Sequence, residues 1–479
     1  MIDAALDGHA NVQFSIVNFS EVNSHRDTRL DATHYHPLHL KNLSNFKEQT
    51  QPLSEYITHI SGGATPLGAV YPEEGVPFLR VQNIMPNYIS GTGMKYLSPS
   101  QNQKIIRSQL KKDDVLLTIT GSYGKSAVVT DEYVGANINQ HSVKMTVKNI
   151  VPYFLSTFLN CKYGYSQSTR HIVGITRPAL DYSAIKTFLI PDLDRVFQET
   201  IGLCCSQAEE LRKDSKACYN QAQTLLLAEL GLVNWQPKQQ LTFVKTFLTL
   251  SLLERIDADY FQPKYDDIVN AIKNCADGYD TLENMVTLKK GVEVGSKAYI
   301  ESGIPFVRVS NLSPFEITQE KYISEELYAA VKEHQPKRGE ILLSKDATPG
   351  IAYYLRETPD KMIPAGGILR LKSKIDKINN EYLTLVLNSI LTQEQVNRDV
   401  GGSVILHWRP DQVAGTVIPI LPQEKQVAIQ EKAIESSRLR KHAKDLLEHA
   451  KRAVEIAIEQ DEQAAIDWLE SQTHEQVIR

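Results

Sequence analysis

Cysteine is scarce in this chain, and its apolar runs are short. The five cysteines are odd in number and form no CxxC pair, which argues against a disulfide framework and against a zinc site. We therefore expect free thiols in a reducing cytoplasm. No apolar run approaches the ~18 residues of a membrane helix, and the N-terminal stretch MIDAALDGHANVQF lacks the basic-then-apolar pattern of a signal peptide. The composition predicts a cytoplasmic protein without a membrane segment.

Positive charge is not in excess either. The 52 Lys and Arg residues are outnumbered by 57 Asp and Glu residues, and the formal net charge is −5. Because nucleic-acid-binding proteins often have a basic excess, this balance counts mildly against DNA as a ligand, unless basic residues are concentrated locally. With 479 residues, 42% of them hydrophobic and 23% charged, the chain has the composition of a globular protein of about three domains.

Motifs of enzymes are also missing. The sequence has no HExxH, GxSxG or FxGxG motif and no DPPY or NPPF tetrapeptide. The stretch LLTITGSYGKSAVV (116–129) comes close to the phosphate-binding loop GxxxxGK[ST]. However, Ile119 stands where the first glycine belongs, and the residues from Ser126 onward favour a strand over a helix. We therefore predict a hairpin turn at Gly121–Gly124. A nucleotide-binding enzyme that uses residues 121–126 is kept as an alternative.

An internal repeat is the main positive feature of the sequence. Three motifs recur at offsets of 226 to 228 residues: RLDATHYHP (29–37) as RIDADYFQP (255–263), GVPFLRVQN (75–83) as GIPFVRVSN (303–311), and LRK (211–213) as LRK (439–441). The pair Asp113–Asp114 aligns with Gly339–Glu340, so catalysis by paired carboxylates is not supported, and we predict no metal site. The steady offset indicates a tandem duplication of a unit of roughly 225 residues.

Each copy is predicted to consist of a β-rich domain and a long helix. Short apolar runs such as VPFLRV, DVLLTIT, IPFVRV and EILLS, separated by turns, are typical of strands. In the helices, apolar or small residues keep a heptad phase from Phe197 to Leu225 and from Ile429 to Ala457, which indicates a coiled coil about 55 Å long. Two ordinary amphipathic helices that pack on separate domains are the alternative.

The predicted fold is therefore mixed α/β, with two tandem β-rich domains joined by two long helices. Duplication favours an antiparallel coiled coil in which the helices are related by a pseudo-twofold axis. The expected boundaries are a first domain at 1–193, a first long helix at 194–230, a second domain at 231–421, a second long helix at 422–460 and a C-terminal tail at 461–479.

Two similar domains on a rod suit a two-part target such as DNA. Arg can bridge guanine, Asn and Gln can bridge adenine, and Lys, Ser and Thr suit phosphate. The candidate contacts in the first domain are Arg80, Gln82, Asn83, Thr120, Ser122, Tyr123, Lys125, Asn139, Gln140, His141, Arg170 and Arg177. Those in the second are Arg308, Ser310, Asn311, Lys345, Thr348, Arg398, His407 and Arg409.

Several of these candidates have structural alternatives. Arg80 and Arg308 occupy matched positions of the repeat, where an ion pair would serve as well as a base contact, and Asn83 and Asn311 could cap turns. The loops at 120–126 and 345–349 are better candidates, because a repeated scaffold holds them while their sequences differ.

The order of the motifs resembles that of the DNA-specificity (S) subunits of type I restriction–modification systems. The similarity extends from about 29 to 460, and it covers both copies. It rests on GVPFLRVQN, DDVLLTITGSYGKSAVV, INQHSVKM and RHIVGITRPALDYSAIKTFLIP followed by a long helix, and on the second closing segment RDVGGSVILHWRPDQVAGTVIPILP. The second copy departs from the family at SKDATPG (344–350), where a glycine-rich turn is usual.

The resemblance implies a non-catalytic subunit. The two β-rich domains would be target-recognition domains that each read half of a split DNA sequence, and the helices would be spacers. Two methyltransferase subunits with S-adenosylmethionine, which methylate adenine N6, would dock around the helices. Two restriction or translocase subunits that use ATP and Mg²⁺ can join them. No contact residue is carried over, because those of the family vary with the target. A coiled-coil scaffold for protein partners, without DNA binding, is a further alternative.

Overall fold

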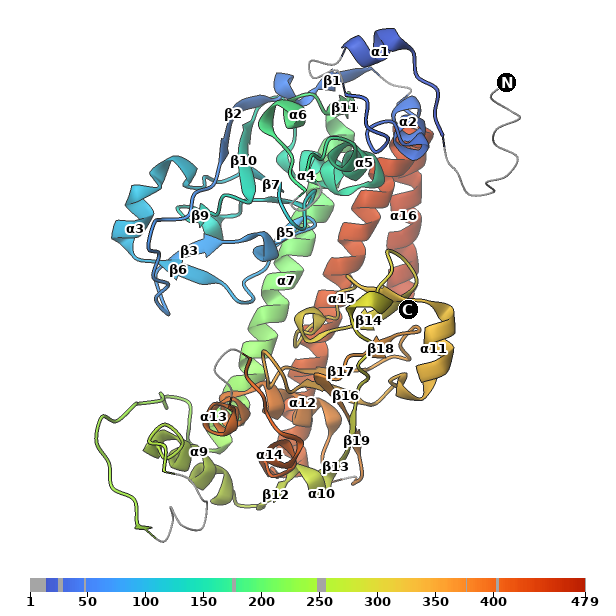
Figure 1. Cartoon of the computed structure of the whole chain (residues 1–479). Coiled ribbons are helices and arrows are strands. Elements are labelled where there is room, and N and C mark those ends of the chain that lie inside the picture. Colours follow the sequence, from blue (N-terminus) through green and yellow to red (C-terminus); the bar gives the residue numbers. More distant parts are fainter. Residues whose placement is uncertain are drawn as a thin grey trace. The chain divides into compact units, whose positions relative to one another are not determined.

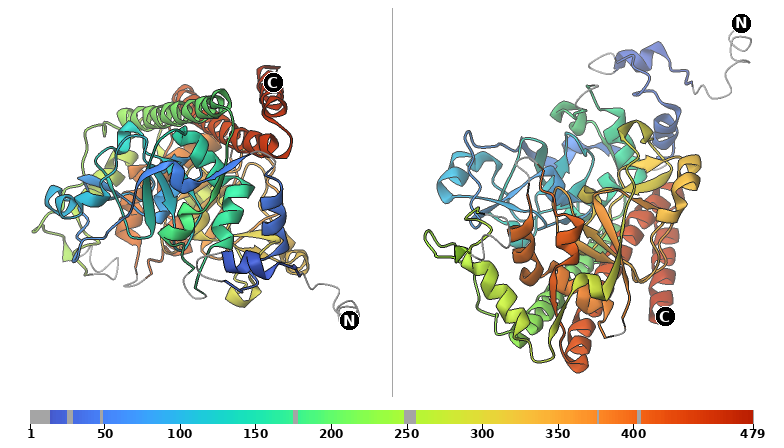
Figure 2. Two further views of the ribbon diagram at one scale, coloured as in Figure 1. Left: turned by 90° about the horizontal axis from the view of Figure 1, so that it is seen from above. Right: turned by 60° about the horizontal axis from the view of Figure 1, so that its bottom comes forward.

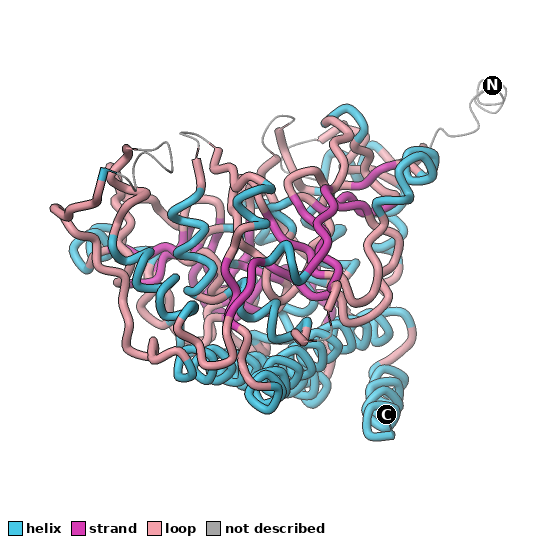
Figure 3. Tube along the Cα trace, turned by 90° about the horizontal axis from the view of Figure 1, so that it is seen from below, coloured by secondary structure: helices cyan, strands magenta, loops and turns pink. Residues whose placement is uncertain are grey.

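The computed structural model describes residues 14–24, 29–46, 49–174, 178–247, 256–375, 377–401 and 405–478. The chain forms two compact units. Unit 1 comprises Met1–Arg212 with Lys441–Arg479, and unit 2 comprises Lys213–Arg440. Figure 1 labels their elements, and Figure 3 shows that the strands are short pieces linked by long loops and helices. Each unit thus contains one β-rich domain together with a part of each long helix.

The main sheet has the same four-stranded order in both units. In unit 1 the order is β2 (Ile57–Gly62), β10 (Ser142–Val147), β7 (Val115–Thr118) and β8 (Ser126–Val128). In unit 2 it is β13 (Val286–Lys290), β19 (Ile368–Ser373), β16 (Ile341–Ser344) and β17 (Ala352–Tyr354). All neighbours in both sheets are antiparallel. The repeat that the sequence predicts is therefore confirmed at the level of strand order.

Most of the smaller sheets repeat in the same way. Each unit has a three-stranded sheet with one parallel pair. In unit 1 its order is β6 (Lys95–Leu97), β3 (Val76–Leu79) and β9 (Asn137–Ile138). In unit 2 its order is β15 (Tyr322–Ile323), β14 (Ile304–Val307) and β18 (Ile363–Pro364). Two-stranded sheets are β1 (Thr50–Pro52) with β11 (Leu189–Pro191), β12 (Tyr279–Thr281) with β20 (Val417–Pro419), and β4 (Ile84–Met85) with β5 (Tyr88–Ile89). Because β1 and β11 bracket the first domain, and β12 and β20 the second, each pair ties a domain's start to its end.

Short helices cover the sheets and carry much of the core. Those of unit 1 are α1 (Phe19–Ser24), α2 (Pro37–Ser44), α3 (Pro99–Lys104), α4 (Pro152–Asn160), α5 (Lys162–Arg170) and α6 (Tyr182–Lys186). Those of unit 2 are α9 (Pro263–Lys273), α10 (Leu282–Met285), α11 (Glu325–Val331), α12 (Asn380–Asn388), α13 (Ile390–Asp399) and α14 (Pro410–Ala414). The α4–α5 pair, turquoise, lies beside the strands of unit 1 in Figure 2.

A buried ion pair links two central strands in each unit. In unit 1, Lys144 Nζ of β10 lies 3.5 Å from Asp114 Oδ2, just before β7. In unit 2, Arg370 of β19 donates to both carboxylate oxygens of Glu340, at 2.8 and 2.9 Å. All four side chains are at most 8% exposed. Asp114 and Glu340 therefore hold two neighbouring central strands together at equivalent positions of the two units.

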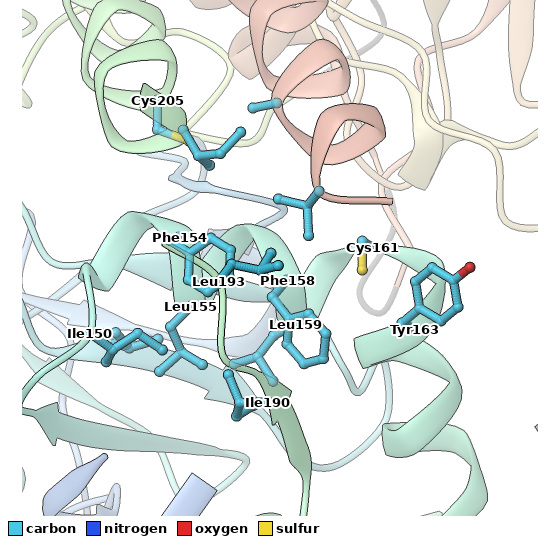
Figure 4. Close-up of a cluster of buried hydrophobic side chains, with 14 of the residues drawn as sticks. Ile150, Phe154, Leu155, Phe158, Leu159, Cys161, Tyr163, Ile190, Leu193 and Cys205 are labelled. Carbon is cyan, nitrogen blue, oxygen red and sulfur yellow. The ribbon is translucent and has the colours of Figure 1, made fainter. Parts of the chain in front are cut away.

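The two long helices are α7 (Arg195–Glu229) and α15 (Gln423–Glu459). In unit 1 the first half of α7 and the second half of α15 share one buried cluster, and in unit 2 the second half of α7 shares a cluster with the first half of α15. The helices therefore run antiparallel and pack together. Figure 4 shows Cys205 of α7 at the edge of the unit 1 cluster that Phe154 and Phe158 of α4 also enter.

The heptad seam is confirmed for most positions, but not at the C-terminal end of α7. Leu226 is fully buried there, whereas Leu225, which the heptad phase selects, is 39% exposed. Leu226 belongs to the core cluster of unit 2, which also contains residues of the β-rich domain. Because α7 packs on this domain as well as on α15, its buried stripe is wider than a coiled-coil seam.

The C-terminal tail forms a helix, α16 (Glu462–Ile478), in unit 1. Ala465 and Leu469 are buried in the unit 1 cluster, and the Trp468 ring packs edge-on against His449 of α15, with 5.5 Å between ring centroids. Within the described ranges, no helix is both long enough and apolar enough to cross a membrane.

Candidate nucleic-acid interface

The loop 119–125 is a tight turn between two paired strands. Leu117 of β7 lies opposite Ser126 of β8 in an antiparallel register, and Gly124 N donates to Thr118 O at 2.9 Å. The Thr118 hydroxyl donates to Ser122 O at 2.8 Å and accepts from Lys125 N at 2.9 Å. Since a strand follows Lys125, no helix N-terminus is present to hold a phosphate. The predicted hairpin is confirmed, and the phosphate-loop alternative is wrong.

The loop 345–351 of unit 2 has the same backbone geometry despite its different sequence. Gly350 N donates to Ser344 O at 2.9 Å, and the Ser344 hydroxyl donates to Thr348 O at 2.6 Å and accepts from Ile351 N at 2.9 Å. Ala347, with φ 59°, takes the left-handed position that Gly121, with φ 75°, holds in unit 1. The SKDATPG segment therefore forms the same turn as its glycine-rich counterpart.

A closing segment pairs with each turn. In unit 1, Leu180 N donates to Ile119 O at 2.9 Å, and in unit 2, Trp408 N donates to Lys345 O at 2.8 Å. Isolated bridges join Thr120 to Ala179 and Asp346 to His407. We call the turn and its closing segment the tip: tip 1 is formed by 119–125 with 173–174 and 178–180, and tip 2 by 345–351 with 401 and 405–408. Arg177, a predicted contact, lies outside the described residues.

An asparagine fixes the far end of each turn. Asn160, the last residue of α4, accepts from Ser126 N at 3.0 Å and donates to Ser126 O at 2.8 Å. Asn388, the last residue of α12, holds Ala352 in the same way, at 2.9 and 2.8 Å. Such paired bonds from a side-chain amide replace a missing strand neighbour. In both units the residue at the end of the turn is therefore bonded to the last residue of a helix.

Tip 1 carries aromatic and neutral polar side chains together with one lysine, Lys125. Tyr123 stacks on Tyr165 of α5, with ring centroids 6.1 Å apart and an interplanar angle of 4°. Burial is the main cause that raises the pKa of Tyr165, so this phenol stays neutral and can donate or accept a hydrogen bond. Ser122 is exposed, and Thr120 and Lys125 are partly exposed. Tyr165 is not among the predicted contacts, since no sequence pattern in the α5 segment distinguishes it from a core residue.

Three further unit 1 candidates follow β9 and precede β10. Gln140 is exposed and accepts a hydrogen bond from Thr65 Oγ1, His141 is partly exposed, and Asn139 is 9% exposed and accepts from His141 N at 3.3 Å. His141 O accepts from Ile119 N at 2.9 Å. The 139–141 segment is thereby bonded to the start of the tip 1 turn, and the Gln140 and His141 side chains extend this candidate surface.

Tip 2 carries a paired cluster instead, formed by Lys345, Asp346 and His407. Asp346 accepts from Lys345 Nζ at 2.6 Å and pairs with His407 Nδ1 at 2.8 Å. Burial raises the pKa of Asp346, but the hydrogen bonds from Lys345 and His407 outweigh it and hold that pKa below its ordinary value. The His407 side chain is 60% exposed, and Thr348 is exposed. Asp346 was not among the predicted contacts, because these were chosen as cationic, amide and hydroxyl side chains that can bind bases or phosphate.

Six of the predicted contacts have structural roles. Asn83 (0% exposed) and Asn311 (2%) are the last residues of two short 3-10 helices, Val81–Asn83 and Val309–Asn311. Their side chains accept from Arg80 N and Arg308 N, so the alternative of turn caps holds for both asparagines. The guanidinium groups are also engaged: Arg80 with Gly93 O, Arg308 with Glu320, Arg170 with His34 O, and Arg398 with Asp399.

The last three candidates remain on the surface. Gln82 and Ser310 are exposed at matched positions of the same two 3-10 helices. Arg409 is exposed beside tip 2 and pairs with Asp411, at 3.1 Å. The structure therefore brings Thr120, Ser122, Tyr123 and Lys125 together at tip 1, and Lys345, Thr348 and His407 at tip 2.

Two of the five cysteines, Cys161 and Cys205, are deeply buried. No group of three or more His, Cys, Asp or Glu side chains in the described part of the chain could hold a metal ion. All five cysteines are free, and burial raises the pKa of Cys161 and Cys205 to about 12, which keeps both thiols protonated.

No protein-family model and no curated protein match this sequence. Several solved structures are similar to the chain, among them three of type I restriction–modification systems. The type I restriction–modification S subunit from M. genitalium is 12% identical with a TM-score of 0.37, over 87% of this chain and 96% of that chain. The HsdS subunit from Thermoanaerobacter tengcongensis is 15% identical with a TM-score of 0.28, over 86% and 97%.

The third structure concerns complex assembly and conformational transition of the type I restriction–modification system, and its chain is 14% identical with a TM-score of 0.27, over 88% and 97%. Since these TM-scores lie below 0.5, the function inferred below rests on the geometry of this chain's own two units. The chain is similar to the three structures over at least 86% of its length.

Proposed function

We propose that this chain is the sequence-specific DNA-recognition subunit of a type I restriction–modification system, and that it reads a two-part DNA sequence. One observation carries the proposal: tips 1 and 2 have the same hydrogen-bonded backbone and different exposed side chains. A duplicated scaffold that varies at one place suits a protein that reads two different short sequences with one geometry.

The side chains at the tips support different readings by the two units. Tip 1 offers Tyr123, Tyr165 and Ser122, which can pack on a thymine methyl group or exchange neutral hydrogen bonds. Tip 2 offers His407 and the Lys345–Asp346 pair, which can bond to base edges and phosphate. We therefore expect the two halves of the target to differ in sequence.

The chain itself would perform no chemistry and hold no cofactor. Two partner methyltransferase subunits would bring S-adenosylmethionine and methylate adenine N6. Two restriction or translocase subunits, where present, would bring ATP and Mg²⁺. This assembly would act on double-stranded DNA in the cytoplasm. A negative net charge of −5 is compatible with that role if the partners supply part of the phosphate contact.

The deciding experiment is base-resolution mapping of N6-methyladenine in the source genome, with and without the gene for this chain. We expect one two-part motif to lose its methylation in the deletion and to regain it on complementation. If the same motifs stay methylated, the chain does not direct this modification, and a protein scaffold becomes the better description. Retention of the complex on DNA that carries the motif, but not on a scrambled duplex, is the matching binding test.

A further inference from the structure

The LRK motif places one arginine of each long helix against an aromatic ring. Arg212 of α7 lies over the Tyr88 ring in unit 1, with Cζ 3.3 Å from the centroid. Arg440 of α15 lies over the Phe315 ring in unit 2, with Cζ 3.9 Å from the centroid. The two arginines are 228 residues apart, as are the two copies of the motif. A guanidinium stacks flat on an aromatic face more favourably than an ammonium does, so this contact is specific for arginine.

In unit 1 the ring is joined to the tip by a short path. Tyr88 belongs to β5, and its neighbour Asn87 donates from its backbone N to Ser126 O at 2.8 Å. The Asn87 side chain accepts from Ser156 and from Asn160, each at 2.9 Å. Asn160 is the residue that fixes the end of the tip 1 turn. Arg212 thus contacts Tyr88, and the preceding residue, Asn87, is hydrogen-bonded to Asn160.

In unit 2 the arginine of the long helix is also close to the asparagine that holds the turn, but the aromatic ring is that of Phe315. Phe315 lies in a turn in which the Ser313 hydroxyl accepts from Phe315 N and Glu316 N. The edge of the Tyr219 ring of α7 also meets Phe315, with centroids 4.8 Å apart. Phe315, Arg440 and Asn388 line one small cavity of about 30 Å³. Asn388 is the residue that fixes the end of the tip 2 turn.

We propose that Arg212 and Arg440 are positioning residues. Each sets the orientation of one tip relative to its long helix, and thereby the base discrimination in one half of the DNA target. This inference rests on the function proposed above. Base recognition through side-chain hydrogen bonds needs the reading side chains to be held within a fraction of an ångström. Loss of either stacking contact therefore relaxes the half that its own unit reads, and leaves the other half unchanged.

A contact with no role beyond stability makes a different prediction. It would lower the amount of folded protein, and with it methylation at every site, without changing which bases are accepted. The base preference in each half of the motif is therefore the readout that separates a positioning role from a merely structural one.

The test uses the full chain with its natural partners, expressed from the native locus, and maps N6-methyladenine at base resolution. Arg440→Ala and Arg212→Ala are compared with wild type. We expect each variant to lose discrimination by on the order of tenfold in one half of the motif, the two variants affecting opposite halves. Phe315→Tyr keeps a ring at that position and should retain wild-type fidelity, as should Tyr88→Phe.

Arg438→Ala is the matched control, because Arg438 lies two residues from Arg440 on α15, is 62% exposed and pairs with Glu435. Should an alanine variant fail to accumulate, Arg440→Lys and Arg212→Lys replace it, since they keep the charge and weaken the stacking.

Two results overturn the inference. In the first, the wild type methylates a two-part motif and all arginine variants keep the same base preference in both halves. This result refutes the positioning role and leaves the proposed function intact. A wild-type genome in which no two-part motif depends on this gene refutes both. Relaxation of opposite halves by the two arginine variants supports the positioning role.

Discussion

Ser215 of α7 and Ser436 of α15 exchange hydrogen bonds across the helix pair. Each hydroxyl donates to the other residue's backbone carbonyl at 2.7 Å, and the two side chains are at most 2% exposed. The buried seam also contains Ala208 and Ala443, which occupy the positions 228 residues away from Ser436 and Ser215. The duplicated seam is thus polar in unit 2 where it is apolar in unit 1.

The serine pair should tolerate alanine and reject larger residues. We expect Ser436→Ala to lower the free energy of unfolding by about 1 kcal/mol, the usual net contribution of one hydrogen bond. Ser436→Leu should cost about 1 to 3 kcal/mol through overpacking. Denaturant unfolding followed by circular dichroism measures both variants. Equal effects of alanine and leucine would show that the helices are not closely packed here.

The buried Glu340–Arg370 pair should be far more sensitive to loss of one partner than to loss of both. Arg370→Met alone leaves a buried carboxylate and should destabilise unit 2 by about 3 to 5 kcal/mol. The double variant Glu340→Leu/Arg370→Met removes both charges, so we expect it to recover most of that loss. Thermal unfolding of the three proteins gives the comparison. A double variant that is no more stable than Arg370→Met alone would contradict this account.

Backbone conformation alone should decide the effect of alanine at Gly121. This residue has φ 75°, and a Cβ atom built there meets nothing within 4 Å. Gly121→Ala should therefore cost about 1 kcal/mol, purely from the left-handed conformation. Gly401→Ala is the control, because its Cβ also meets nothing and its φ is not in that region. A smaller shift in unfolding midpoint for Gly121→Ala than for Gly401→Ala would refute the reasoning.

Acid should weaken tip 2 through Asp346. The folded-state pKa of this carboxyl is lowered from 3.8, so its pairing with Lys345 and His407 stabilises the fold above about pH 3.8 and is lost as pH falls through the lower folded value. Asp346→Asn lacks this group, and the stability difference between wild type and variant should therefore shrink below pH 3.8. Unfolding midpoints from pH 3 to pH 7 test the sign. A difference that grows on acidification would be the opposite of the expected result.

Local patterns in the sequence anticipated the elements that depend on local chemistry. β-branched residues after Ser126 predicted β8 in place of a phosphate-binding helix, and heptad spacing predicted α7 and α15. The repeat predicted that SKDATPG (344–350) and TITGSYG (118–124) hold equivalent positions. Whether Ala347 could take the left-handed position of Gly121 was decided by the turn's hydrogen bonds, which the sequence does not display.

Local sequence patterns could not predict contacts between residues that are distant along the chain. Asp346 and His407 are 61 residues apart, and the partner atoms meet only because a closing segment returns to the turn. Tyr165 reaches Tyr123 from a helix that is otherwise part of the core, and Asn83 is buried where an exposed base contact was considered. Long-range side-chain contacts depend on how helices and strands pack together, and the periodicity of a single sequence does not predict that packing.

The amino-acid sequence by itself determined the duplication, the alternation of β-rich domain and long helix, and the equivalence of the two turns, because each follows from residue type and spacing along the chain. Tertiary structure alone decided which side chains gather at each tip and which arginine rests on which ring. These are choices among many sterically possible neighbours, and only the packing of the whole unit, with its buried polar groups paired, selects one of them.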